Sequence, residues 1–209
     1  MKTDKFNKFS VPLGLLDYIN PIFYTITIMT IIKSIHLESP FKIIMIIGAV
    51  LSIVFGFVIP TGKVIVGLGI IKFKMPVSLV FLVNVGILLS GLMLFKFVMN
   101  LELVLLIIIS LIILLLLTII YHKSKKINTI AVLTGAFGYL FIYFSLIILS
   151  IRKSIFLPTL FYLLAIILFV MLCGIGIKAN LKDPKVHWKI EISNVICQGL
   201  VALGTIILF

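Results

Sequence analysis

Long runs of apolar residues alternate with short polar stretches along the whole chain, and this pattern predicts a bundle of membrane-spanning helices. A helix needs roughly 20 mostly apolar residues to cross a bilayer. Runs of that kind occur at 12–32, 40–59, 76–97, 103–121, 130–151, 158–177 and 186–207. Several begin at or near a proline, which favours the first turn of a helix. We therefore predict an all-α, polytopic membrane protein with seven transmembrane helices in a single membrane domain, 1–209.

Composition and charge support this prediction and add an orientation. Hydrophobic residues make up 63% of the chain and charged residues 11%, which leaves too few charges to cover a soluble domain. The net charge is +12, but the basic residues lie between apolar runs, where they meet anionic lipid head groups, so we expect no nucleic-acid partner. Thirteen of the 18 Lys and Arg residues fall on the side of the N-terminus. This asymmetry predicts a cytoplasmic N-terminus and an external C-terminus. The abundance of Lys and Ile suggests a bacterial inner membrane.

An internal duplication is indicated by a shift of 120 residues. The segment 23–37 then aligns with 143–157, with six of fifteen positions identical, including Lys-Ser-Ile at 33–35 and 153–155. Chance is the alternative, because Ile and Leu are so common here. A true duplication gives a parallel 3+1+3 arrangement, with 12–97 and 130–209 as triple-helix halves and 103–121 as a connector. Its layout resembles that of seven-helix sugar and vitamin-precursor transporters built from two triple-helix bundles, without a shared motif.

Polar residues recur at helical spacing on single faces of several predicted spans. Because polar side chains facing lipid are costly, such faces normally point into the bundle. We therefore expect the stripes of the first, third and seventh spans to converge on a cavity in the cytoplasmic half. The alternative is hydrogen bonding between neighbouring helices, worth only about 0.6 kcal/mol per pair in membranes. The candidate substrate-binding residues are Asp17, Asn20, Tyr24, Asn84, Glu191, Asn194 and Gln198.

Two acids stand out, because Asp17 and Glu191 are the only carboxylates expected near this cavity. We expect no basic residue beside either of them inside the membrane. They are candidate proton or cation sites if they face the cavity, and ordinary headgroup-layer residues if they do not. The segment 60–76 is expected to be a cytoplasmic loop, with a shallow re-entrant gate as the alternative because it contains three glycines.

The inventory of reactive residues does not favour an enzyme. His36, His122 and His187 are spread along the chain, and the sequence contains no nucleophile motif or paired carboxylates. Asp183, His187 and Glu191 have metal-compatible helical spacing, but Asp183 is better explained as a helix cap. We therefore expect no catalytic residues, no metal and no cofactor.

These features favour a small integral membrane carrier for a small polar solute, with a cytoplasm-facing polar cavity. Two alternatives stay open. One is a non-catalytic membrane partner, such as an assembly or immunity factor, and the other is a membrane-embedded lipid-modifying enzyme. Besides the lipid bilayer and the solute, the partners left open by the sequence are a second copy of the chain and a membrane partner protein.

Overall fold

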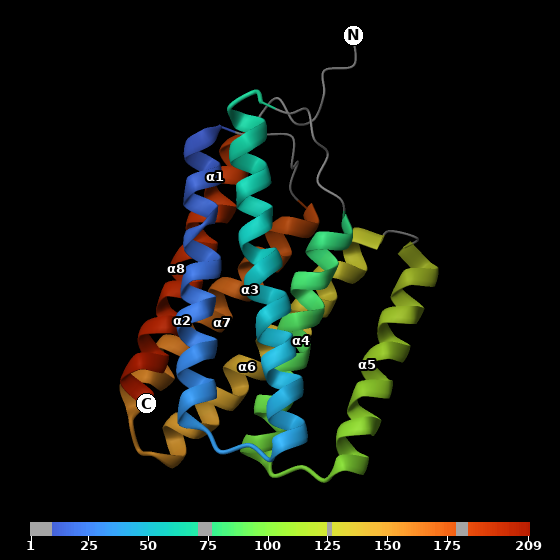
Figure 1. Cartoon of the computed structure of the whole chain (residues 1–209), viewed down its shortest axis with the longest axis vertical. Coiled ribbons are helices and arrows are strands. Elements are labelled where there is room, and N and C mark those ends of the chain that lie inside the picture. Colours follow the sequence, from blue (N-terminus) through green and yellow to red (C-terminus); the bar gives the residue numbers. More distant parts are fainter. Residues whose placement is uncertain (1–9, 71–76, 125–126, 179–183) are drawn as a thin grey trace.

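A computed structural model of the chain describes residues 10–70, 77–124, 127–178 and 184–209, and those residues are predominantly helical (Figure 1). Among these residues, seven segments are long and apolar enough to cross a membrane, in agreement with the predicted number of spans. The first two helices together form the first span. The helices are α1 (Val11–Asp17), α2 (Ile19–Ser34), α3 (Ser39–Gly67), α4 (Val77–Met99), α5 (Leu103–Ser124), α6 (Ile127–Arg152), α7 (Phe156–Lys178) and α8 (Pro184–Leu208).

The first span is interrupted at Tyr18, between α1 and α2. Pro21 explains the position of the break. Proline has no N–H to donate, so the carbonyl of Asp17, four residues earlier, cannot receive its usual helical hydrogen bond. At the break itself, the N–H of Tyr18 bonds to the carbonyl of Leu15 at 3.2 Å, which is three residues back rather than the usual four. Asp17 therefore lies at a break in the helix, where the backbone is less regular than in the rest of the span.

The second span is longer than the sequence pattern predicts. We expected it to end near residue 59 and a loop to follow, yet α3 continues through Pro60 as far as Gly67. The expectation of a loop is therefore wrong for residues 60–67, and 71–76 lie outside the described residues. An internal proline is tolerated in membrane helices, because neighbouring helices compensate for the missing hydrogen bond. Pro60 itself is buried.

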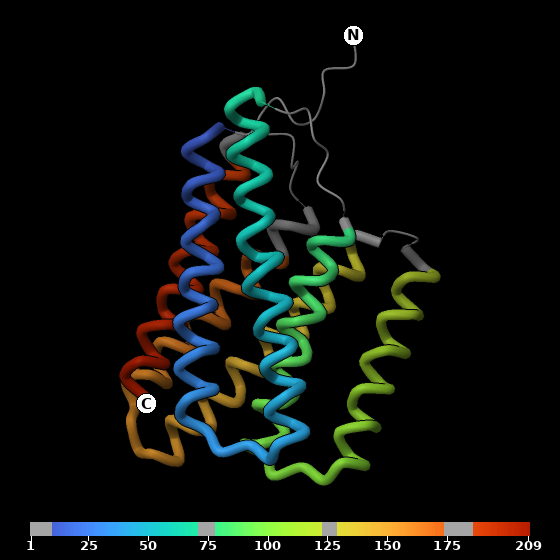
Figure 2. The backbone as a smooth tube through the Cα atoms, in the orientation of Figure 1, coloured from blue at the N-terminus to red at the C-terminus, as the bar shows by residue number. Residues whose placement is uncertain are grey.

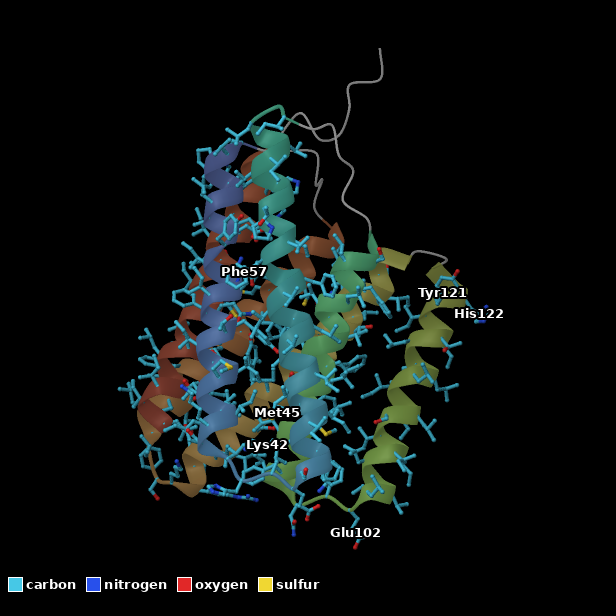
Figure 3. All side chains as sticks on the ribbon, viewed as in Figure 1. Lys42, Met45, Phe57, Glu102, Tyr121 and His122 are labelled. Atoms are coloured by element: carbon cyan, nitrogen blue, oxygen red, sulfur yellow. The ribbon has the colours of Figure 1, made fainter. Side chains whose placement is uncertain are left out.

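Six helices form a closed ring, in which α2, α3, α4, α6, α7 and α8 each pack against the next and α8 packs against α2. α5 packs against α6 and stands at the margin of the bundle (Figures 1 and 2). Tyr121 and His122 mark one end of this outer helix and Glu102 precedes the other (Figure 3). The span that forms α5 contains no Gly or Ala, which is typical of a helix that faces lipid rather than packing closely against its neighbours.

Glycines bring the backbones of α3, α4 and α6 into close contact. A Cβ atom added to Gly86 would lie 2.8 Å from the backbone nitrogen of Ser52, and one added to Gly48 would lie 2.7 Å from the carbonyl oxygen of Gly86. At the next interface, a Cβ atom on Gly138 would lie 2.6 Å from the backbone nitrogen of Leu88. These contacts are too short for any larger residue, so the small residues of α3 serve helix packing.

The two ends of the bundle differ. We call the end that holds α1, the last turn of α3 and the start of α8 the N-terminal end, and the end that holds Phe209 the C-terminal end. α1 and α3 extend beyond α4 and α5 at the N-terminal end (Figure 1). The half nearer the C-terminal end contains most of the largest fully buried apolar side chains. These are Ile28, Ile31, Met45, Leu94, Val98, Ile142, Leu146 and Val201.

Hydrogen bonds from basic side chains link helices at the C-terminal end. Nη1 of Arg152, at the end of α6, donates to the carbonyl oxygen of Val98 in α4 at 2.6 Å. Nζ of Lys153 donates to the carbonyl oxygen of Leu208 in α8 at 3.0 Å. Both acceptors lie in the last turn of a helix, where carbonyl groups lack helical partners and favour a positive charge. The C-terminal half is thus filled by apolar side chains, and these two hydrogen bonds hold helix ends together there.

Candidate functional site

A charged cluster joins four helices near the N-terminal end, and we define it as Asp17, Asn20, Lys63 and Glu191. Nζ of Lys63 donates to Oδ2 of Asp17 at 2.6 Å and to Oε1 of Glu191 at 3.1 Å. Nδ2 of Asn20 donates to the remaining oxygens, Oδ1 of Asp17 at 3.3 Å and Oε2 of Glu191 at 3.4 Å. The lysine and the amide thus bridge the same two carboxylates.

Each member of the charged cluster is placed by the local course of its helix. Asp17 ends α1 at the break described above, and Asn20 lies in the first turn of α2. Lys63 lies one turn before the end of α3, and Glu191 lies two turns into α8. A second contact holds α1 and α3 together here, because the hydroxyls of Tyr18 and Thr61 lie 2.6 Å apart.

The cluster is largely shielded from solvent and carries an unbalanced charge. The side chain of Lys63 is 18% exposed, and those of Asp17 and Glu191 are each 12% exposed. Two carboxylates share one ammonium group, so the ionised cluster carries one net negative charge. Buried charges are costly unless each is paired and hydrogen-bonded, and removing one partner leaves the others without compensation. Lys63 therefore supplies the positive charge that the two acids share.

Lys63 corrects the expectation that neither acid has a basic neighbour. The sequence pattern assigned Lys63 to a loop after residue 59, and the continuation of α3 instead brings it back over the first span. A signal was present in the sequence, because the apolar residues after Pro60 continue with helical spacing.

A row of unpartnered polar atoms begins at the charged cluster and follows the inner face of α2. Within the described part of the chain, Oδ1 of Asn20, the hydroxyl of Tyr24 and Oγ1 of Thr27 are buried and complete no hydrogen bond, although the hydroxyls of Ser52 and Ser90 lie near that of Tyr24. Their spacing of four and three residues places them one above another on a single helix face. Tyr24 is only 5% exposed and Thr27 only 3%. Most buried polar groups in proteins are hydrogen-bonded, so three successive exceptions need an explanation.

A group of aromatic residues lies deeper in the ring, and we call Tyr24, Tyr139, Tyr143 and Phe169 the tyrosine cluster. The rings of Tyr24 and Tyr139 meet edge to face, with 6.5 Å between their centroids. Tyr139 and Tyr143 lie 5.7 Å apart, and Phe169 of α7 contacts both. Residues from α2, α6 and α7 therefore meet in the interior of the ring, although these helices are separated along the sequence.

Gln198 connects the tyrosine cluster to α8. Its Nε2 donates to the hydroxyl of Tyr143 at 3.4 Å. Gln198 lies seven residues after Glu191 on the same face of α8, which places it about 10 Å deeper in the bundle. Glu191, Asn194 and Gln198 therefore form one stripe from the charged cluster to the tyrosine cluster, and Asn194 is half-buried between them.

The predicted site residues are brought together only in part. Asp17, Asn20 and Glu191 meet in the charged cluster, while Tyr24 and Gln198 lie at the tyrosine cluster. Asn84 lies elsewhere, because its side chain packs against Gly135 at the interface of α4 and α6. The expected meeting of Asn84 with Gln198 is thus not among the contacts that the structure describes.

Some participants were missed at the sequence level. Besides Lys63, these are Tyr139 and Tyr143, which lie one turn apart on α6. Their spacing of four residues, which places both hydroxyls on one face of α6, was a usable signal. Thr134 and Ser145, two polar residues of the same helix, use their hydroxyls to bond carbonyls of their own helix.

Asp183, the first member of the metal-compatible series, lies outside the described residues. Among the residues that are described, no group of three potential metal ligands is found.

Comparison with protein-family models, curated proteins and solved structures finds no match for this chain. Its function therefore has to be inferred from the geometry of the charged cluster, the row of polar atoms and the tyrosine cluster.

Proposed function

We propose that this protein is a membrane carrier for a small polar solute, which passes the charged cluster and binds beside the tyrosine cluster. One observation carries the proposal: the buried polar atoms of Asn20, Tyr24 and Thr27 lie in a row and have no partner among the described residues. A buried donor or acceptor without a partner costs about 1–3 kcal/mol. Such a row is expected where a polar solute supplies the missing hydrogen bonds.

The alternative, that polar residues merely join neighbouring helices, does not account for this row. A polar side chain that joins two helices has its partner on the neighbouring helix. Asn84 and Gln198 are compatible with that role, and so is Tyr24, whose hydroxyl lies near those of Ser52 and Ser90, but Thr27 is not, since its hydroxyl finds no partner within the described chain. A solute-binding role explains why these hydroxyls are kept in the interior.

The layout of the ring supports a carrier with two similar halves. Exchanging α2, α3 and α4 for α6, α7 and α8 leaves the order of packed neighbours around the ring unchanged. Local detail agrees with the shift of 120 residues, because Thr25 bonds to the carbonyl of Pro21 and Ser145 to that of Phe141, both at 2.6 Å. Parallel repeats of this kind can rock against each other about an axis along the membrane normal.

The asymmetry between the two ends supports a direction of access. The C-terminal half is sealed by apolar side chains and by the bond from Arg152 to Val98. Polar groups reach the interior from the N-terminal end. With the N-terminus in the cytoplasm of a bacterium, as the distribution of basic residues favours, this is a cytoplasm-facing state of the carrier.

A binding screen followed by uptake tests the proposal. Purified protein is screened by thermal shift against small polar solutes, and uptake of a stabilising solute is measured in proteoliposomes. Thr27→Val should weaken solute binding about tenfold by removing one hydrogen bond. Thr25→Val is the matched control, because this hydroxyl on the same helix already bonds to its own backbone.

Two results contradict the carrier. One is that no solute stabilises the protein, and the other is that Tyr24→Phe, Thr27→Val and Gln198→Leu all leave uptake unchanged. Copurification of a second membrane protein, together with an absence of solute binding, favours the partner-protein alternative instead.

A further inference from the structure

We propose that the charged cluster is a binding site for the primary ammonium group of the transported solute, and that Lys63 occupies this site when the solute is absent. The inference rests on the proposed carrier function and narrows its substrate class to small amines. Its basis is the way in which two carboxylates are held together from two sides.

The two carboxylates have a support that does not depend on Lys63. Asn20 donates to one oxygen of Asp17 and one of Glu191, and these are not the oxygens that Lys63 uses. A neutral amide thus holds one edge of the pair, while the ammonium group of Lys63 bridges the other edge. If the lysine side chain moves away, the oxygens at 2.6 and 3.1 Å are left facing a space that fits an ammonium group.

The balance of charge and of hydrogen-bonding groups selects a cation. The ionised cluster has one net negative charge even with Lys63 in place, and an anion would add to it. Acceptors also exceed donors, since Oδ1 of Asn20 is buried beside the carboxylates without a partner in the described chain. A primary ammonium group brings three N–H donors, as lysine does. A solute ammonium group can therefore make the same hydrogen bonds as the ammonium group of Lys63.

The position of Lys63 permits this exchange. It lies one turn from the end of α3, in the part of the bundle that extends beyond α4 and α5 (Figure 1). Its flexible four-carbon stem can carry the ammonium group outward to water or to lipid head groups. Exchanging one ammonium group for another leaves the charge of the cluster unchanged, so no uncompensated carboxylate is created during entry.

The rest of the solute would extend toward the interior. Tyr24 and Thr27 lie one and two turns beyond Asn20 on the same face of α2, and neither hydroxyl completes a hydrogen bond within the described residues. A small amine with a polar group a few bonds from its nitrogen can reach from the charged cluster to these hydroxyls. The charged cluster is thus the recognition site for the amine, and the row of hydroxyls receives the rest of the molecule.

Methylammonium is the probe for the test, measured by thermal shift on purified full-length protein. Tetramethylammonium, a cation without N–H donors, and sodium chloride at equal ionic strength are the control salts. The variant Lys63→Met removes the competing side chain. The triple variant Asp17→Asn, Lys63→Met, Glu191→Gln removes the site while keeping side chains of similar size. Lys33→Met, at an exposed position of α2, controls for the loss of a lysine.

We expect methylammonium to stabilise the wild-type protein saturably and the control salts to have little effect. If Lys63 fills the site about nine-tenths of the time, the apparent affinity should be about tenfold tighter in Lys63→Met than in the wild type. The triple variant should not respond. If Lys63→Met fails to fold, the comparison of wild type and triple variant decides.

The inference is overturned if methylammonium and tetramethylammonium act alike on the wild type, or if the triple variant responds as the wild type does. A response to sodium chloride equal to that to methylammonium overturns the choice of an ammonium ligand. The carrier proposal has a separate outcome, because a neutral solute that depends on Thr27 would uphold the carrier even when methylammonium fails.

Discussion

Removing the charges of the charged cluster one at a time and then together should show whether its three charged residues stabilise one another. The quantity compared is the free energy of unfolding of each variant. Lys63→Met leaves two carboxylates close together without their shared ammonium group. Removing one partner of a buried ion pair costs 3–5 kcal/mol. Because 12–18% of each side chain remains exposed, we expect Lys63→Met to lower the free energy of unfolding by about 3 kcal/mol, the lower end of that range.

The triple variant Asp17→Asn, Lys63→Met, Glu191→Gln should behave differently. It keeps the approximate volumes of the side chains and allows neutral hydrogen bonds with Asn20, while no charge remains buried. Replacing a whole buried ion cluster by neutral groups of similar size is often close to neutral. We therefore expect its stability to lie within about 1 kcal/mol of the wild type, although it carries two more substitutions than the less stable Lys63→Met.

Unfolding by denaturant in mixed micelles measures these differences. Trp188 is the only tryptophan of the chain and lies on α8 close to Glu191, so its fluorescence reports on the helix that the cluster anchors. The matched control is Lys33→Met, an exposed lysine whose loss should change stability by less than about 0.5 kcal/mol. The single variants Asp17→Asn, Lys63→Met and Glu191→Gln are measured as well. If the triple variant lowers the free energy of unfolding by the sum of the three single effects, the residues act independently and the reasoning about a shared ammonium group is wrong.

Three further predictions concern packing and buried hydroxyls. Thr27→Val should raise the free energy of unfolding by about 1 kcal/mol, since it removes an unpartnered buried hydroxyl at nearly constant side-chain volume, and denaturant unfolding would contradict this by showing a loss. Gly86→Ala should destabilise by about 2 kcal/mol or more through its contact with α3, whereas Gly199→Ala meets mainly an aromatic side chain and should cost less in the same measurement. Arg152→Met should cost about 1–2 kcal/mol and speed hydrogen exchange at the end of α4, and an unchanged exchange rate would show that its bond to Val98 does not hold the C-terminal end.

Tertiary packing explains why the prediction of the candidate site succeeded only in part. Helical spacing alone places Glu191, Asn194 and Gln198 on one face of α8, and Asn20 and Tyr24 on one face of α2. Spacing cannot tell which neighbour such a face meets. Asn84 was expected in the shared interior, but it packs against Gly135, because the glycine contacts between α4 and α6 draw that helix pair together.

The sequence by itself determined that this protein folds in a lipid bilayer and how many helices are long and apolar enough to span it. Seven apolar runs with too few charges for a water-exposed surface leave little choice, since a bilayer requires backbone hydrogen bonds to be made within each helix. That requirement is local, and a local pattern is enough to reveal it. The same holds for α5, whose lack of Gly and Ala is typical of an outer helix.

Only the tertiary structure decided the position of Lys63. A proline in a sequence predicts the end of a helix, because it removes a hydrogen bond and crowds the preceding turn. In the folded protein α3 continues past Pro60, which is buried, and Lys63 therefore reaches Asp17 and Glu191. The pairing joins residues 46 and 128 positions apart, and a charge balance over such separations is set by the packing of whole helices.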